Sequence, residues 1–291
     1  MQTIIGTKKV RFPQFGTLNC ILSFPSEYVQ ARRVDIWLPD NYNPRSEYAV
    51  IYMHDGQNLF NPAVGFHGMI WAIDQALQPL IDQQKVRPAI VVGIWNTPLR
   101  YQEYLPAPAF HLLSDTLRNM LREEHNNPAL HPMSENYLKF IVNELKPFID
   151  SQYPTLSDVE NTFIMGSSMG GLISSYAIAS YPEVFGGAGC VSTHWPLSLH
   201  LNETAYSQAY IKWLSENLPQ PGHHRIYFDY GTETIDAFYE QHQLEMDQKM
   251  KEIGYSEGKN WLTLKDDGAP HSESAWKNRV HIPLEFLLKT D

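Results

Sequence analysis

The stretch "FIMGSSMGGLISSYAIAS" (residues 163–180) passes from an apolar run through Gly-Ser-Ser-Met-Gly-Gly into a segment with helical spacing. In the pattern G-x-S-x-G, the serine sits on a tight turn between a strand and a helix, and the turn lifts its hydroxyl clear of the sheet. The pattern assigns Gly166, Ser168 and Gly170. Alone it is weak, because it arises by chance in roughly one chain in ten of this length. The strand and helix patterns on either side make Ser168 the candidate nucleophile.

Short apolar runs recur on both sides of this stretch, with helical patterns between them. Continuous apolar runs bounded by turn residues are typical of parallel strands covered on both faces. The sequence therefore predicts an α/β fold with a mostly parallel, doubly wound sheet and an antiparallel N-terminal edge around residues 18–38. Strands are predicted at 33–38, 48–53, 89–94, 161–165, 187–192, 225–230 and 261–265, and helices at 69–81, 137–148, 235–253 and 274–288.

The domain organisation follows from length and connection lengths. With 43% hydrophobic residues, residues 1–291 can fill one large core, so a single domain is expected. Segments 100–132 and 193–223 are too long for ordinary connections. Both are expected to be insertions over the active site, at the carboxyl edge of the sheet, where α/β folds bind ligands.

Charge and composition exclude several classes of partner. The formal net charge of -10 repels nucleic acids and anionic membrane surfaces. No stretch has the length of apolar residues that a membrane span needs, and the first twenty residues do not resemble a cleavable leader. Cys20 and Cys190 are far apart in the sequence, which favours free thiols in a reducing compartment. A cytoplasmic enzyme with a small-molecule substrate is expected.

A serine nucleophile needs a histidine base and a carboxylate that orients the histidine. In an α/β-hydrolase these follow the serine in the order acid, then histidine. His271 is the candidate base because it lies after the last predicted strand, in the turn-rich "DDGAPHSES". The loop after strand 225–230 offers two acids, of which Asp236 is preferred and Glu233 is the alternative.

The developing oxyanion needs two backbone amides. One is expected from Met169, which follows the nucleophile, and the other from Gln57 in "HDGQNLF". Gly56 is expected to let the backbone approach the substrate there.

Several motifs occur in the order of the predicted elements. The segments "IYMHDGQNLF", "GSSMGG", "YPEVFGG", "GTET" and "GAPHSESAW" together resemble the putative esterase family of α/β-hydrolases. The resemblance implies a serine hydrolase of esters or thioesters that uses no metal or organic cofactor, with Ser168 and His271 in the catalytic roles. The family's acid usually lies three residues after the strand-end glycine, where this chain has Thr234. The acid therefore stays divided between Asp236 and Glu233.

The substrate is less determined than the chemistry. The stretch "GIWNTPLRYQEYLP" (residues 93–106) is similar to a segment near the active site of that family, so Asn96 and Arg100 could bind substrate or support a loop. Trp195, at a predicted strand end, could form a pocket wall or pack in the core. Short-chain acyl esters or acylated sugars are the expected substrates. The alternatives are an acyltransferase of the same fold and a catalytically silent member that binds a glycan or a protein.

Overall fold

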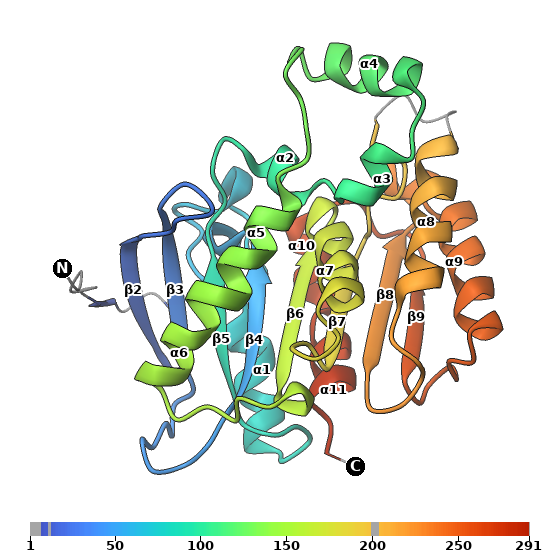
Figure 1. Cartoon of the computed structure of the whole chain (residues 1–291). Coiled ribbons are helices and arrows are strands. Elements are labelled where there is room, and N and C mark those ends of the chain that lie inside the picture. Colours follow the sequence, from blue (N-terminus) through green and yellow to red (C-terminus); the bar gives the residue numbers. More distant parts are fainter. Residues whose placement is uncertain (1–6, 11–12, 199–203, 291) are drawn as a thin grey trace.

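The computed structural model of the chain describes residues 7–10, 13–198 and 204–290, which are built around one twisted sheet (Figure 1). In this part of the chain the strand order is β1-β2-β3-β5-β4-β6-β7-β8-β9. The pairs from β5 through β9 are parallel, whereas β1, β2, β3 and β5 pair antiparallel. This confirms the predicted sheet and its antiparallel edge. The strands are β1 (Lys8–Val10), β2 (Thr17–Phe24), β3 (Arg32–Leu38), β4 (Ala49–His54), β5 (Ala89–Ile94), β6 (Thr162–Ser167), β7 (Gly187–Val191), β8 (Arg225–Gly231) and β9 (Trp261–Asp266).

Helices cover both faces of the sheet, which explains why the central strands are apolar throughout. Side chains alternate between the faces of a strand. In β4, Val50 and Tyr52 enter one hydrophobic core, whereas Ile51 and Met53 enter the other. The first core packs under α5 (Ser134–Phe140), α6 (Lys146–Gln152), α7 (Met169–Ser180), α8 (Ala205–Asn217) and α9 (Glu240–Glu252), and the second under α1 (Ile73–Asp82) and α11 (His281–Leu288) (Figure 1).

Prolines and turns divide two of the predicted helices. The pattern at 274–288 forms α10 (Glu273–Arg279) and α11, which meet at Val280. Pro283 has no amide hydrogen for the carbonyl of Arg279, which favours a break in the helix near that residue. The pattern at 235–253 forms a 3-10 turn, η5 (Thr234–Phe238), followed by α9.

The two predicted insertions differ from each other. The first contains α2 (Arg100–Tyr104), α3 (Ala107–His111) and α4 (Asp115–Glu124), and Figure 1 shows α3 and α4 beyond the ends of the strands. The second contains α8, which contacts α7 and α9 on one face of the sheet. This part of the prediction was wrong: α8 is the crossover helix that the parallel strands β7 and β8 require. Residues 199–203 of that segment lie outside the described part of the chain.

Among the described residues, no helix is both long and apolar enough to cross a membrane.

Candidate active site

Ser168 occupies a sharp turn between β6 and α7. Its backbone has φ 59° and ψ -121°, and its amide donates to the carbonyl of Val191 at 2.9 Å. A side-chain-bearing residue in such a conformation costs about 1–3 kcal/mol and persists only where the surroundings hold it. The glycines of the motif make the turn feasible, because a Cβ on Gly166 would lie 3.0 Å from the Cα of Gly170. The predicted strand, turn and helix are all present.

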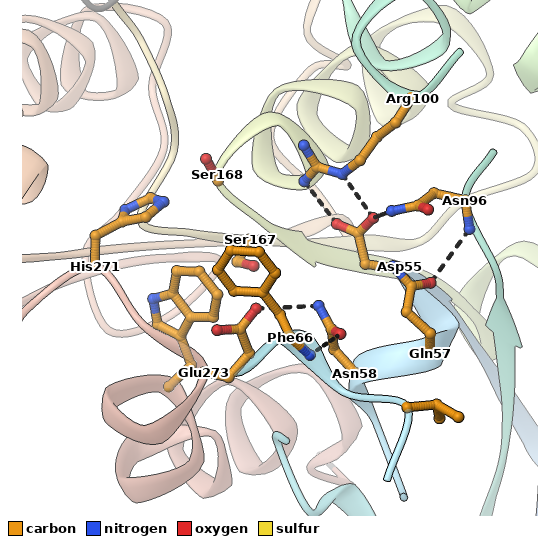
Figure 2. Close-up of a pocket in the computed structure, with 12 residues that line it drawn as sticks. Asp55, Gln57, Asn58, Phe66, Asn96, Arg100, Ser167, Ser168, His271 and Glu273 are labelled. Atoms are coloured by element: carbon orange, nitrogen blue, oxygen red, sulfur yellow. Dashed lines mark hydrogen bonds and ion pairs between the residues drawn. The ribbon is translucent and has the colours of Figure 1, made fainter. Parts of the chain in front are cut away.

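His271 lies in the loop between β9 and α10, and it lines the same pocket as Ser168 (Figure 2). Its Nδ1 is 2.5 Å from Oδ1 of Asp236, and its backbone amide donates to Thr234 Oγ1 at 2.9 Å. A carboxylate at Nδ1 holds the proton on that nitrogen and leaves Nε2 free to accept. The structure describes no hydrogen bond between Ser168 and His271.

Asp236 is the carboxylate that the fold brings to His271. It is fully buried and also accepts hydrogen bonds from Ser192 Oγ (2.6 Å) and the amide of Gly231 (2.8 Å). Burial opposes ionisation, but the hydrogen bond and charge of His271, with the bonds from Ser192 and Gly231, hold the pKa of Asp236 below its usual value.

The alternative acid lies away from the histidine. Glu233 is exposed and precedes η5, whereas Asp236 is within that turn. Thr234, where the resemblance implies an acid, has φ 55° and accepts from the amide of His271 through its hydroxyl. Within the described residues, Asp236 and not Glu233 is hydrogen-bonded to the His271 side chain.

A buried polar network supports Asp236 from behind. Ser192 Oγ accepts from Trp276 Nε1 at 2.9 Å and from Arg279 Nη2 at 2.8 Å. Arg279 also pairs with Asp229 at 3.0 Å. The network joins α10 to the ends of β7 and β8. Its members come from three separate segments, so no local sequence pattern predicts them.

The two expected oxyanion donors lie at neighbouring strand ends. Gln57 belongs to the 3-10 turn η1 (Gly56–Asn58) after β4, and Met169 is the first residue of α7. Within the described residues, neither backbone amide donates a hydrogen bond to another backbone group. A Cβ on Gly56 would lie 2.6 Å from the backbone of Gly93, so this glycine allows close packing against β5.

Asn96 and Arg100 both line the pocket, and both hold Asp55 (Figure 2). Arg100 Nε and Nη2 each donate to Asp55 at 2.7 Å, and Asn96 Nδ2 donates to it at 2.6 Å. Burial would raise the pKa of Asp55, but these contacts hold it below its usual value. Asp55 has φ 55° and lies two residues before Gln57. These hydrogen bonds support the loop that carries Asp55, which is one of the two roles expected for Asn96 and Arg100.

Two neutral histidines pack beside the serine turn. Burial lowers the pKa of His54 and of His194 to about 3. His54 Nδ1 is 2.8 Å from Tyr137 Oη, and His194 Nδ1 is 2.6 Å from Tyr239 Oη. They are packing groups at neutral pH.

The pocket has a volume of about 450 Å³. Part of its lining, which includes Val64, Phe66 and Glu273, was not predicted from the sequence. The lining residues are Asp55, Gln57, Asn58, Val64, Phe66, Asn96, Arg100, Ser167, Ser168, His271, Glu273 and Trp276. Trp195 is not one of the residues that line the pocket. Its side chain is 1% exposed and Nε1 donates to Gln243 Oε1 at 3.1 Å, so the expected contact with substrate was wrong and core packing is correct. Within the described residues, no group of three or more His, Cys, Asp or Glu side chains is placed to hold a metal ion.

Comparisons with known proteins agree on family and fold. The family model described as putative esterase matches residues 26–280. The uncharacterized protein YbbA of Bacillus subtilis (strain 168) is 26% identical over 264 residues, which cover 88% of this chain and 92% of the relative. The ferri-bacillibactin esterase BesA of the same organism is 27% identical over 175 residues, which cover 57% of this chain and 55% of the relative.

Solved structures share the fold at low sequence identity. A ferulic acid esterase from Anaeromyces mucronatus superposes with a TM-score of 0.63 and 17% identity, covering 97% of this chain and 93% of the other. The enterobactin esterase FES from Shigella flexneri gives a TM-score of 0.64 and 18% identity, covering 98% of this chain and 59% of the other. The likeness extends over nearly all of the sheet and its covering helices.

Proposed function

Because this chain belongs to the putative esterase family, we propose that it hydrolyses carboxylic esters through an acyl-enzyme formed on Ser168. The observation that carries the proposal is the bond between His271 Nδ1 and Asp236 Oδ1 at the pocket that also contains the strained turn of Ser168. These are the nucleophile, base and orienting carboxylate that acyl transfer requires. Unliganded active sites often lack the hydrogen bond between nucleophile and base, which tightens when substrate binds.

In the proposed acylation step, Ser168 Oγ attacks the carbonyl carbon of the ester while His271 Nε2 takes its proton. The new bond converts the carbonyl oxygen into an oxyanion, and His271 becomes an imidazolium. Asp236 holds the Nδ1 proton and stabilises that charge through the 2.5 Å contact. His271 then gives the proton from Nε2 to the leaving alcohol, and the acyl group stays on Ser168.

The amides of Gln57 and Met169 are proposed to hold the oxyanion. Each amide lacks a backbone acceptor among the described residues, so each can donate to a new acceptor. Removal of one such donor costs other enzymes about 3–4 kcal/mol of transition-state stabilisation. The ion pair of Asp55 and Arg100 supports the turn that carries Gln57.

In the proposed deacylation step, water takes the place of the departed alcohol. His271 Nε2 removes a proton from the water, the hydroxide attacks the acyl carbon, and Ser168 leaves with the proton returned by His271. The products are a carboxylic acid and an alcohol. The pocket volume of about 450 Å³ favours short acyl esters or acylated sugars over long-chain lipids.

The test is labelling with a fluorophosphonate probe together with a panel of p-nitrophenyl esters. Native protein is expected to be labelled and to prefer acetyl over long acyl chains. Ser168→Ala should abolish both labelling and hydrolysis. Ser151→Ala, which removes an exposed hydroxyl on α6, is the control. Labelling that persists in Ser168→Ala would contradict the proposed nucleophile.

A further inference from the structure

Glu273 places a carboxylate without a cation in the wall of the pocket. Its side chain lines the pocket that contains Ser168, although the residue is only 6% exposed. Oε1 accepts a hydrogen bond from Asn58 Nδ2 at 3.0 Å (Figure 2). Within the described part of the chain, Glu273 forms no ion pair with Lys, Arg or His. The other acidic and basic residues of the pocket are Asp55 and Arg100, which form an ion pair with each other, and His271.

Two aromatic residues line the same pocket as this carboxylate. Trp276 follows Glu273 by three residues on α10, so both lie on one face of that helix, and Trp276 Nε1 is fixed by its bond to Ser192. Phe66 lies on the opposite wall with 59% of its surface exposed. Asn58 joins the two walls, because it donates to Glu273 and accepts from the amide of Phe66 at 3.0 Å.

A carboxylate in a pocket that is also lined by aromatic rings suits one class of ligand better than others. Aromatic faces attract cations, and the ammonium group is the usual ligand of such sites. A neutral hydroxyl could give the carboxylate one hydrogen bond, whereas an ammonium also compensates its charge. An anion would be repelled here and by the net charge of -10 on the whole chain.

We propose that Glu273, Phe66 and Trp276 bind a positively charged ammonium group on the alcohol part of the ester substrate. The alcohol side is favoured because His271, which gives its proton to the leaving alcohol, lies only two residues before Glu273, in the loop that leads into α10. The inference rests on the proposed ester hydrolysis and names its substrate class.

The surroundings of Glu273 compensate its charge only in part. Burial raises the pKa of Glu273 and the negative charge of Asp55 adds to this effect, whereas a hydrogen bond from its own backbone amide and the positive charges of His271 and Arg100 oppose it. A buried carboxylate without a cation in direct contact is unfavourable. An ammonium group in contact with it would stabilise the ionised form.

The test compares esters of equal shape and different charge. Acetylcholine carries a trimethylammonium group, 3,3-dimethylbutyl acetate is its neutral carbon analogue, and 2-sulfoethyl acetate is anionic. For native protein, kcat/KM should be about tenfold higher for the cationic ester than for its neutral analogue, which corresponds to about 1.4 kcal/mol. The anionic ester should be the poorest of the three. Tetramethylammonium ion should inhibit hydrolysis of p-nitrophenyl acetate competitively.

Glu273→Gln removes the charge and keeps an oxygen that can accept from Asn58. In this variant the ratio of the cationic to the neutral ester should fall to near one, and inhibition by tetramethylammonium should be lost. Glu216→Gln, which removes an exposed charge on α8, should keep the ratio of the native protein. A native circular dichroism spectrum and an unchanged midpoint of thermal unfolding verify that the Glu273 variant is folded.

A ratio near one in native protein, or a ratio that Glu273→Gln does not change, would overturn the inference. If p-nitrophenyl acetate is still hydrolysed through Ser168 in that case, the proposed function stands and only the substrate class is wrong. If no ester is hydrolysed, both proposals are overturned.

Discussion

Replacement of Asp236 by asparagine tests the proposed catalytic machinery most directly. The native carboxylate accepts from His271, Ser192 and Gly231. The asparagine oxygen can still accept from Ser192 and Gly231, so its amide group is left facing His271 Nδ1 and must donate to it. That moves the histidine proton to Nε2, where it blocks transfer from Ser168. A change of this kind lowers kcat by about 10⁴-fold, or about 5 kcal/mol, in a serine hydrolase.

The assay is the steady-state hydrolysis of p-nitrophenyl acetate at pH 7.5, with the rate of fluorophosphonate labelling as a second measure of Ser168 reactivity. Asp236→Asn should lower both strongly, whereas KM should change little because Asp236 does not line the pocket. The matched control is Glu233→Gln in the same loop, which should keep near-native activity. An Asp236→Asn variant with more than a tenth of native kcat, or an equal loss in Glu233→Gln, would refute the assignment of the acid.

Three further predictions concern residues around the site. His54 is neutral in the folded protein because burial lowers its pKa to about 3, whereas in the unfolded chain it takes up a proton near pH 6.5. The free energy of unfolding should therefore fall as the pH is lowered from 6.5 toward 3. In urea titrations, His54→Gln should reduce this dependence by up to about 1.4 kcal/mol per pH unit. Arg100→Ala leaves the Asp55 carboxylate without its cation and should destabilise the fold by about 2 kcal/mol, less than a fully buried pair because a third of the Arg100 side chain is exposed. In the same urea assay Arg118→Ala, which breaks a pair with an exposed carboxylate, should be nearly neutral, and equal losses would contradict this reading. Trp195→Phe should lower the free energy of unfolding by about 1–2 kcal/mol, because Oε1 of Gln243 loses its donor, and should leave KM unchanged. Phe66→Ala should change KM and leave the free energy of unfolding nearly unchanged, because the side chain is 59% exposed.

The central part of the fold could be predicted because its physical causes are local in the sequence. Strands buried on both faces must be continuously apolar, and this pattern identified β4, β5, β6 and β7 to within one or two residues. The turn of Ser168 needs small neighbours, and the glycines that supply them are part of the motif itself. His271 was predicted from its place after the last strand, and the structure brings it to the pocket of Ser168.

The rest of the site depends on contacts between distant segments. Glu233 and Asp236 are three residues apart in one loop, and only the conformation of Thr234 and the turn that follows it decide which carboxylate faces His271. The wall around Phe66 belongs to a loop with no periodic pattern. Glu273 could have been predicted from its place in the sequence: it lies two residues after the proposed base, so its carboxylate is well placed to line the same pocket.

The network behind the histidine loop separates the position of the proposed base from the shape of the pocket wall at Val64 and Phe66. Arg279 and Ser192 fasten α10 to the sheet, and the link from α10 through Asn58 to residue 66 uses its backbone amide, so the position of His271 does not depend on the side chains of Val64 and Phe66. Those two side chains are 42% and 59% exposed, and neither is needed for the core. Directed evolution for a new alcohol can therefore vary positions 64 and 66 while the turnover of the acyl group stays close to native.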